Sequence, residues 1–203
     1  SFNPQSRMLR VLEMEISSGI YVEVTLSPEK FPAPSQGFDT IREGIERGKL
    51  ETVEYDSTTV GIKRKAQVYT PPGYTKDRPY PVLYLLHGIG GDETEWARYA
   101  TPDILFDNLI AEGKVPPMIV VMPSGWTPSG GQVMTSDASK DPFNAEMMTD
   151  IIPHIQANYR TLTTPEKRAL SGLSMGGIQT LNVGLHNLGT FRYLVVMSSG
   201  WTT

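Results

Sequence analysis

The sequence contains no cysteine, and it has only three histidines among its 203 residues. The absence of cysteine excludes disulfides, thiolate metal sites and cysteine nucleophiles, and it leaves the redox compartment open. The histidines His87, His154 and His186 are too scattered for a metal-ligand motif. No glycine-rich stretch ends in the Gly-Lys-Ser/Thr of a phosphate loop. We therefore expect neither a metal ion nor another cofactor.

Long apolar runs and runs of basic residues are missing as well. No apolar segment approaches the roughly 18 residues of a membrane span. The net charge is −4, and no basic run accompanies it. We therefore expect no membrane insertion and no nucleic-acid partner. The first ten residues lack the apolar core of a signal peptide and begin with Ser1, so we expect any export signal to have been removed already.

The composition is that of an ordinary globular protein, with 39% hydrophobic and 20% charged residues, and the length suits one sizeable core. Residues 1–40 are predicted to form an N-terminal extension or linker, with one short strand at 21–26 followed by a proline-rich stretch. The tail of a preceding module and an extension of the main domain explain this segment equally well. The main domain is predicted to span residues 41–203.

From residue 50 onward, strand-like and helix-like hydrophobic patterns alternate. Strands are predicted at 50–55, 65–69, 81–87, 118–122, 168–171 and 191–197, and the first two are expected to pair. Helices are predicted at 101–112, 143–159 and 175–186, with a long polar loop at 124–140. This order favours an α/β fold with a mostly parallel sheet that helices cover on both faces.

The strongest chemical signal is the segment Gly172-Leu173-Ser174-Met175-Gly176, a G-x-S-x-G pentapeptide between a predicted strand and a predicted helix. The chain must reverse there within a few residues, so the backbone at the serine is strained and the hydroxyl projects above the carboxyl edge of the sheet. A serine that merely caps a glycine-rich helix start is the alternative. The strand-turn-helix context favours Ser174 as a catalytic nucleophile.

A second glycine-rich segment, His87-Gly88-Ile89-Gly90-Gly91, directly follows a predicted buried strand. Acyl transfer requires two backbone donors for the oxyanion, one after the nucleophile and one from an earlier strand-to-helix loop. The N–H groups of Met175 and Ile89 fit these two roles. For His87, a position beside glycines favours hydrogen bonds that shape the loop over a role as general base.

A base for Ser174 is not apparent in the sequence. In G-x-S-x-G hydrolases the acid and the histidine follow the nucleophile, yet the 29 residues after Ser174 contain no Asp or Glu and only His186. The intervening helix places His186 about 18 Å from Ser174, and His154 belongs to another predicted helix. Because a serine hydroxyl without a base is a poor nucleophile, a binding module of the same fold remains an alternative.

Taken together, these motifs resemble those of the feruloyl esterases of the esterase-D-like α/β-hydrolase group, which occur in modular enzymes that degrade plant cell walls. The resemblance covers about residues 37–203, and it implies an α/β-hydrolase fold whose last strands are missing. The family's Asp and His come from loops after the next two strands, beyond residue 203. The resemblance rests on Gly37-Phe38-Asp39, Arg42-Glu43-Gly44-Ile45, Tyr69-Thr70-Pro71-Pro72-Gly73-Tyr74, Tyr84-Leu85-Leu86-His87-Gly88-Ile89-Gly90-Gly91, Asp107-Asn108-Leu109-Ile110-Ala111-Glu112-Gly113-Lys114 and Gly172-Leu173-Ser174-Met175-Gly176-Gly177.

The resemblance implies hydrolysis of feruloyl or related hydroxycinnamoyl esters on arabinoxylan or its oligosaccharides, through an acyl-enzyme on Ser174 with the oxyanion held by the Ile89 and Met175 amides. It further implies a secreted protein whose parent chain carries a xylanase or carbohydrate-binding module as a neighbour. An acetylxylan esterase is the alternative within the hydrolases. Trp126 and Trp201 are candidates for lining the acyl pocket, although packing is the commoner role of a tryptophan. The same holds for Trp96. We expect all three tryptophans in loops that follow strands or near helix starts.

Overall fold

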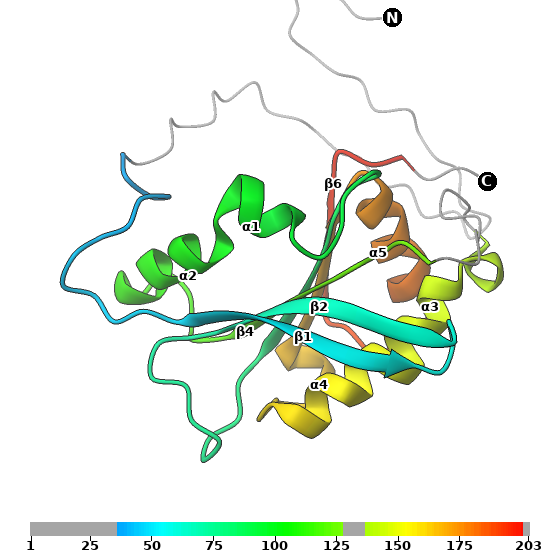
Figure 1. The fold of residues 1–203 in the computed structure, drawn as a ribbon, viewed down its shortest axis with the longest axis horizontal. Helices are drawn as coiled ribbons and strands as arrows, with labels where there is room; N and C mark the ends of the chain where they lie inside the picture. Colours follow the sequence, from blue (N-terminus) through cyan, green and yellow to red (C-terminus); the bar gives the residue numbers. More distant parts are fainter. Residues whose placement is uncertain (1–35, 128–136, 201–203) are drawn as a thin grey trace, which may run out of the picture. The chain divides into compact units, whose positions relative to one another are not determined.

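The computed structural model describes residues 36–127 and 137–200, which contain a six-stranded mixed sheet in the order β1-β2-β4-β3-β5-β6 (Figure 1). Strands β4, β3, β5 and β6 pair in parallel, whereas β1 with β2 and β2 with β4 pair antiparallel. The predicted α/β sheet and the predicted pairing of the first two strands are thereby confirmed. The strands are β1 (Lys49–Ser57), β2 (Ile62–Thr70), β3 (Val82–Leu86), β4 (Ile119–Pro123), β5 (Arg168–Leu173) and β6 (Tyr193–Met197).

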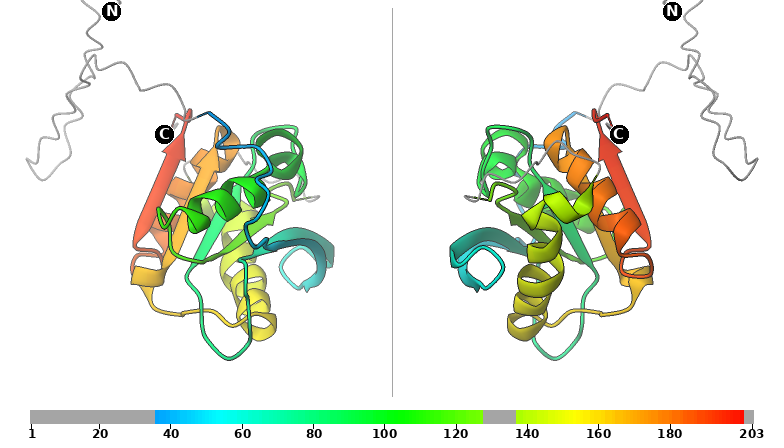
Figure 2. Two further views of the ribbon diagram at one scale, coloured as in Figure 1. Left: turned by 90° about the vertical axis from the view of Figure 1, so that its left-hand side faces the viewer. Right: turned by 90° about the vertical axis from the view of Figure 1, so that its right-hand side faces the viewer.

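Helices cover both faces of the sheet, as predicted. Figure 2 shows α1 and α2 on one side of it and α4 and α5 on the other. None of the helices in the described ranges has the length and apolar character needed to cross a bilayer. The helices are α1 (Glu95–Ala100), α2 (Pro102–Ala111), α3 (Pro142–Glu146), a π-helical turn (Met147–Ile151), α4 (Ile152–Asn158) and α5 (Met175–His186), with 3-10 turns at Ala138–Lys140 and Pro165–Lys167.

Two apolar clusters form the core, one on each face of the sheet. Because successive residues of a strand point to opposite faces, Tyr84 and Leu86 of β3 belong to the cluster under α3 to α5, whereas Leu85 belongs to the other cluster. Trp96 packs against this second cluster from α1. Trp96 is the second residue of α1, so its expected position near a helix start is confirmed.

The helix predicted at 143–159 is present but is interrupted by the π-helical turn, whose last bond runs from the Ile152 N–H to the Met147 carbonyl. A π turn displaces the carbonyls of the preceding turn, and this accommodates the ring of Pro153. The same turn directs Asp150 at the β1–β2 hairpin. Although burial acts to raise the pKa of Asp150, hydrogen bonds from Thr58 and its neighbours lower that pKa to about 2.

Strand β6 is the edge of the described sheet. It pairs with β5 on one side, and its Tyr193 and Val195 side chains are 56% and 50% exposed. The predicted strand at 191–197 is present, and these side chains are exposed because no further element of the described residues covers them. The predicted strand at 21–26 lies outside the described residues, and the boundary predicted near residue 40 stays a prediction.

Candidate active site

Ser174 lies at the turn from β5 into α5, and its backbone adopts φ 54° and ψ −112°. Positive φ is unfavourable for a residue with a side chain, so the turn stores strain that the surrounding structure must hold. The flanking glycines make the turn sterically feasible. A Cβ on Gly176 would lie 2.6 Å from the His87 carbonyl oxygen, and one on Gly172 would overlap the Gly176 carbonyl. The predicted strand-turn-helix geometry is present.

Backbone hydrogen bonds fix the position of Ser174 from both sides. Its N–H donates to the Met197 carbonyl of β6 at 2.9 Å, and its carbonyl accepts from the N–H groups of Gly177 and Ile178 at 2.9 and 3.1 Å. The side chain of Ser174 is half-buried. Backbone contacts on both sides thus hold Ser174, while its side chain stays partly accessible.

The two predicted oxyanion donors belong to segments that meet at Ser174. Met175 is the first residue of α5, so its N–H has no helical acceptor. The loop after β3 passes beside the serine, since a Cβ on Gly88 would lie 3.8 Å from the Ser174 Cβ. Residues 88–91 form a turn closed by the Gly91 N–H donating to the Gly88 carbonyl, which leaves the Ile89 N–H outside the turn's hydrogen bond. That these two amides serve one oxyanion stays a prediction.

His87 shapes this loop. It is 1% exposed, and its Nε2 accepts from the Gly125 N–H at 2.7 Å. Its Nδ1 lies 2.7 Å from the Gly88 carbonyl, so Nδ1 carries the proton and donates to that oxygen. With both ring nitrogens engaged by backbone groups, His87 has no free nitrogen for the Ser174 proton. The loop-shaping interpretation is confirmed.

Residues 57–202 match the family model described as "Putative esterase". The chain belongs to this esterase family. It is 36% identical over 176 residues to an endo-1,4-β-xylanase/feruloyl esterase of Xylanibacter ruminicola, covering 84% of this chain and 24% of the relative. It is 32% identical over 148 residues to an esterase of Mycobacterium tuberculosis, covering 70% and 30% of the two chains.

Solved structures of feruloyl esterases share the fold. A ferulic acid esterase from Anaeromyces mucronatus superposes with a TM-score of 0.72 at 29% identity, covering 81% of this esterase and 64% of that chain. The same fungal enzyme has been solved in complex with ferulic acid. The predicted α/β-hydrolase fold and the resemblance to feruloyl esterases are confirmed. The chain spans about a quarter of the xylanase/feruloyl esterase that it matches and less than two thirds of the fungal enzyme.

In this esterase, hydrogen bonds hold the loop after β4 next to the turn at Ser174. These bonds were not predicted from the sequence. Gly125 is held at both backbone groups, since its N–H donates to His87 and its carbonyl accepts from the Gln179 amide at 3.0 Å. The guanidinium of Arg64 donates to the Ser124 carbonyl at 2.8 Å. A Cβ on Gly125 would lie 3.4 Å from the Met175 Cε, so the loop touches the residue after the nucleophile.

Trp126 is the next residue of this loop, so these hydrogen bonds also place it near the turn at Ser174. Its surface is 36% exposed. Its role in substrate binding stays a prediction, and Trp201 lies outside the described residues. Gln179 was missed by sequence reasoning, although a signal existed. It lies one helical turn after Met175 and is fully buried, so a polar side chain occupies the inward face of a predicted helix.

Asp141 extends the same network. Its Oδ1 accepts from the Phe143 N–H at 3.0 Å, whereas Asp141 Oδ2 and the neighbouring Gln179 Oε1 are both buried without a hydrogen-bond partner in the described residues. Burial raises the pKa of the Asp141 carboxyl above its ordinary value. The Phe143 N–H and the Gln179 side chain offset part of this rise.

We expect Asp141→Asn to stabilise the esterase at pH 7 by about 1–3 kcal/mol, because Asn keeps the helix cap and places no charge in this buried position. Since the folded-state pKa is raised, the contribution of Asp141 is complete below the ordinary carboxyl pKa and is lost as pH rises through the raised value. The gain should therefore be small at pH 4 and larger at pH 7 in urea unfolding. Asp141→Ala, which removes the cap, should be less stable than the wild type at both pH values. A pH-independent difference between Asp141→Asn and the wild type would contradict this account.

The base that would activate Ser174 is not among residues 36–127 and 137–200. In these ranges no side chain makes a hydrogen bond to the Ser174 hydroxyl. His186 donates from Nδ1 to the Asn182 carbonyl at the far end of α5, and the His154 ring packs 5.6 Å from that of Tyr55. Over the same ranges no three His, Asp or Glu side chains gather in a way that could hold a metal ion.

Proposed function

We propose that this protein is a serine carboxylic-ester hydrolase that releases ferulate or a related hydroxycinnamate from plant cell-wall arabinoxylan or its oligosaccharides. The observation that carries the proposal is the strained turn at Ser174 beside the Gly88–Gly91 loop. The chain's 36% identity to an endo-1,4-β-xylanase/feruloyl esterase supports the substrate class. No cofactor is required for this chemistry.

The proposed mechanism follows from the arrangement of these groups. The Ser174 hydroxyl attacks the ester carbonyl while a base accepts its proton, and the Ile89 and Met175 N–H groups stabilise the oxyanion. The sugar alcohol then leaves with a proton, and water hydrolyses the acyl-enzyme to release the hydroxycinnamate. The family resemblance implies that a His oriented by an Asp supplies the base, from loops after two further strands.

The acyl group would lie against the loop after β4, where Trp126 offers a half-exposed indole to an aromatic ring. Trp201 is the second proposed contact. Because the polysaccharide is a large polymer, we also propose a secreted protein. The relative that combines a xylanase and a feruloyl esterase in one chain supports a neighbouring xylanase or carbohydrate-binding module in the parent protein.

The proposal is tested by offering the full-length protein both feruloylated arabinoxylan and acetylated xylan, with release of ferulate and acetate measured by chromatography. We expect ferulate release, and a kcat/KM for methyl ferulate at least about tenfold above that for an acetyl ester. Acetate release without ferulate would identify an acetylxylan esterase. A folded protein that cleaves neither ester would favour the non-catalytic binding module.

A further inference from the structure

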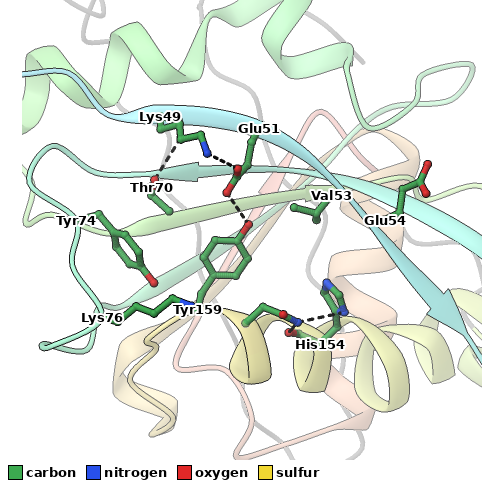
Figure 3. A pocket seen from close by; sticks show the side chains of 10 residues that line it. Lys49, Glu51, Val53, Glu54, Thr70, Tyr74, Lys76, His154 and Tyr159 are labelled. Atoms are coloured by element: carbon green, nitrogen blue, oxygen red, sulfur yellow. Dashed lines mark hydrogen bonds and ion pairs between the residues drawn. The ribbon is translucent and has the colours of Figure 1, made fainter.

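A groove at the other end of the sheet has no part in the mechanism above. It consists of two adjoining hollows of about 530 and 250 Å³, both lined by Lys76, Asn158 and Tyr159. We call it the tyrosine groove, because Tyr74 and Tyr159 line its larger hollow (Figure 3). The larger hollow has the volume range of ligand sites in proteins, and the shared lining residues show that the two hollows adjoin.

The tyrosine groove is remote from Ser174. Its lining residue Thr70 pairs with Lys49 of β1, and the adjacent Tyr69 pairs with Val120 near the start of β4. Ser174, in contrast, follows the carboxyl end of β5, which runs parallel to β3 and β4. The groove and the nucleophile therefore lie at opposite ends of the parallel strands, and a ligand in the groove leaves the active site free.

The two tyrosine rings of the groove are held in place before any ligand arrives. The ring of Tyr74 packs 5.1 Å from that of Tyr80, and its hydroxyl accepts from the Arg160 N–H at 3.0 Å. Tyr159 donates its hydroxyl to Glu51 at 3.0 Å, and its ring centroid lies 6.4 Å from that of Tyr74. Fixed aromatic faces bind a ligand without a further loss of side-chain entropy.

The polar lining of the larger hollow is balanced in charge. Lys49 donates to Glu51 at 2.6 Å, and Lys76 and Glu54 add one charge of each sign. Burial lowers the pKa of His154, so its imidazole is neutral at pH 7. Such a lining offers no net charge to an ionic ligand, but it offers many donors and acceptors next to aromatic faces. A sugar ring presents the same combination, with C–H groups on its face and hydroxyls at its edge.

We propose that the tyrosine groove is a second carbohydrate-binding site, which holds a neutral oligosaccharide segment such as the unsubstituted xylan backbone. Two adjoining hollows offer room for more than one sugar ring, which suits a chain better than a compact ligand. Xylan as the source rests on the proposed function. A polymer held there keeps the protein on the polysaccharide, which raises the local concentration of ester-bearing branches that Ser174 can reach. Small soluble esters gain nothing from the groove.

The test measures binding of xylohexaose by calorimetry to the full-length protein carrying Ser174→Ala. Xylohexaose has no ester, so the readout does not depend on the proposed reaction. We expect Tyr159→Ala to weaken binding at least about tenfold, whereas Tyr159→Phe, which keeps the ring, should retain binding within about threefold. Tyr193→Ala, which removes an exposed tyrosine of β6 outside the groove, should leave binding unchanged.

Asn158→Trp distinguishes a loss of ligand binding from a loss of folding. Asn158 is exposed at the end of α4, so the fold should tolerate the change, and the indole would fill the groove. This variant should abolish xylohexaose binding, keep the thermal unfolding midpoint and the rate on methyl ferulate, and slow ferulate release from arabinoxylan. Absence of binding by the unaltered groove, or equal binding by Asn158→Trp, would overturn the proposal. Tighter binding of oligogalacturonate than of xylohexaose would also overturn it. A protein that binds xylohexaose but hydrolyses no ester would contradict the proposed function and would leave the proposal for the tyrosine groove intact.

Discussion

Ser174→Ala in the full-length protein is expected to lower kcat for methyl ferulate by at least about 10⁴-fold. The reason is that the proposed acyl-enzyme can form on no other atom, while the oxyanion amides of Ile89 and Met175 stay in place and account for the residual rate. Initial rates at saturating methyl ferulate measure the effect. Substrate binding should change little, because the hydroxyl is a small part of the contact surface.

Ser199→Ala provides a matched control. Ser199 packs against Gly177 in the first turn of α5, so it is another hydroxyl close to the nucleophile turn. Its hydroxyl donates to the Gly200 carbonyl at 2.9 Å and has no place in the proposed chemistry. This variant should keep kcat within about threefold. More than about 1% residual activity in Ser174→Ala would contradict the assignment of the nucleophile.

Glu146→Ala is expected to destabilise the fold by about 3–5 kcal/mol, because it leaves a buried guanidinium without its counter-charge. Glu146 is fully buried and accepts from the Arg64 Nε and from the Tyr55 hydroxyl, both at 2.8 Å. The Arg64 side chain is only 7% exposed, so water does not replace the lost carboxylate. Urea unfolding at pH 7 measures the change in free energy.

Two further variants test that explanation. Glu54→Ala removes a carboxylate that is 57% exposed and lies 3.7 Å from Lys65, and it should cost less than about 1 kcal/mol. Replacing both members of the buried pair, with Arg64→Met and Glu146→Leu together, should recover most of the stability lost in Glu146→Ala. A loss below about 1 kcal/mol in Glu146→Ala would show that the pair is not needed.

The sequence predicted those parts of the fold that follow from local pattern. Short continuous apolar runs located β3 and β4, because both strands are buried on both faces. The G-x-S-x-G spacing located the turn at Ser174. Helix α1 was not predicted, because none of its residues is fully buried and its six residues span less than two turns. The π-helical turn was also missed, because its apolar residues still fit an ordinary helical pattern.

The contacts that hold the candidate site are non-local, and local pattern does not predict them. Arg64 and Glu146 are 82 residues apart, and the Gln179 amide reaches Gly125 across 54 residues. Only the fold brings such groups together. The tyrosine groove is a similar case, because its lining comes from β1, the segment after β2, and α4. Sequence reasoning therefore predicted a nucleophile and two oxyanion donors, but not the non-local contacts around them.

The hydrogen bond from the Ser174 N–H to the Met197 carbonyl has a consequence for how the protein matures. During synthesis the nucleophile leaves the ribosome before β6 does, so its turn lacks this anchor until β6 has docked against β5. The strained conformation at Ser174 is therefore one of the last features of this region to be completed. A nascent chain in which β6 has not yet docked should consequently react slowly with active-site-directed acylating reagents.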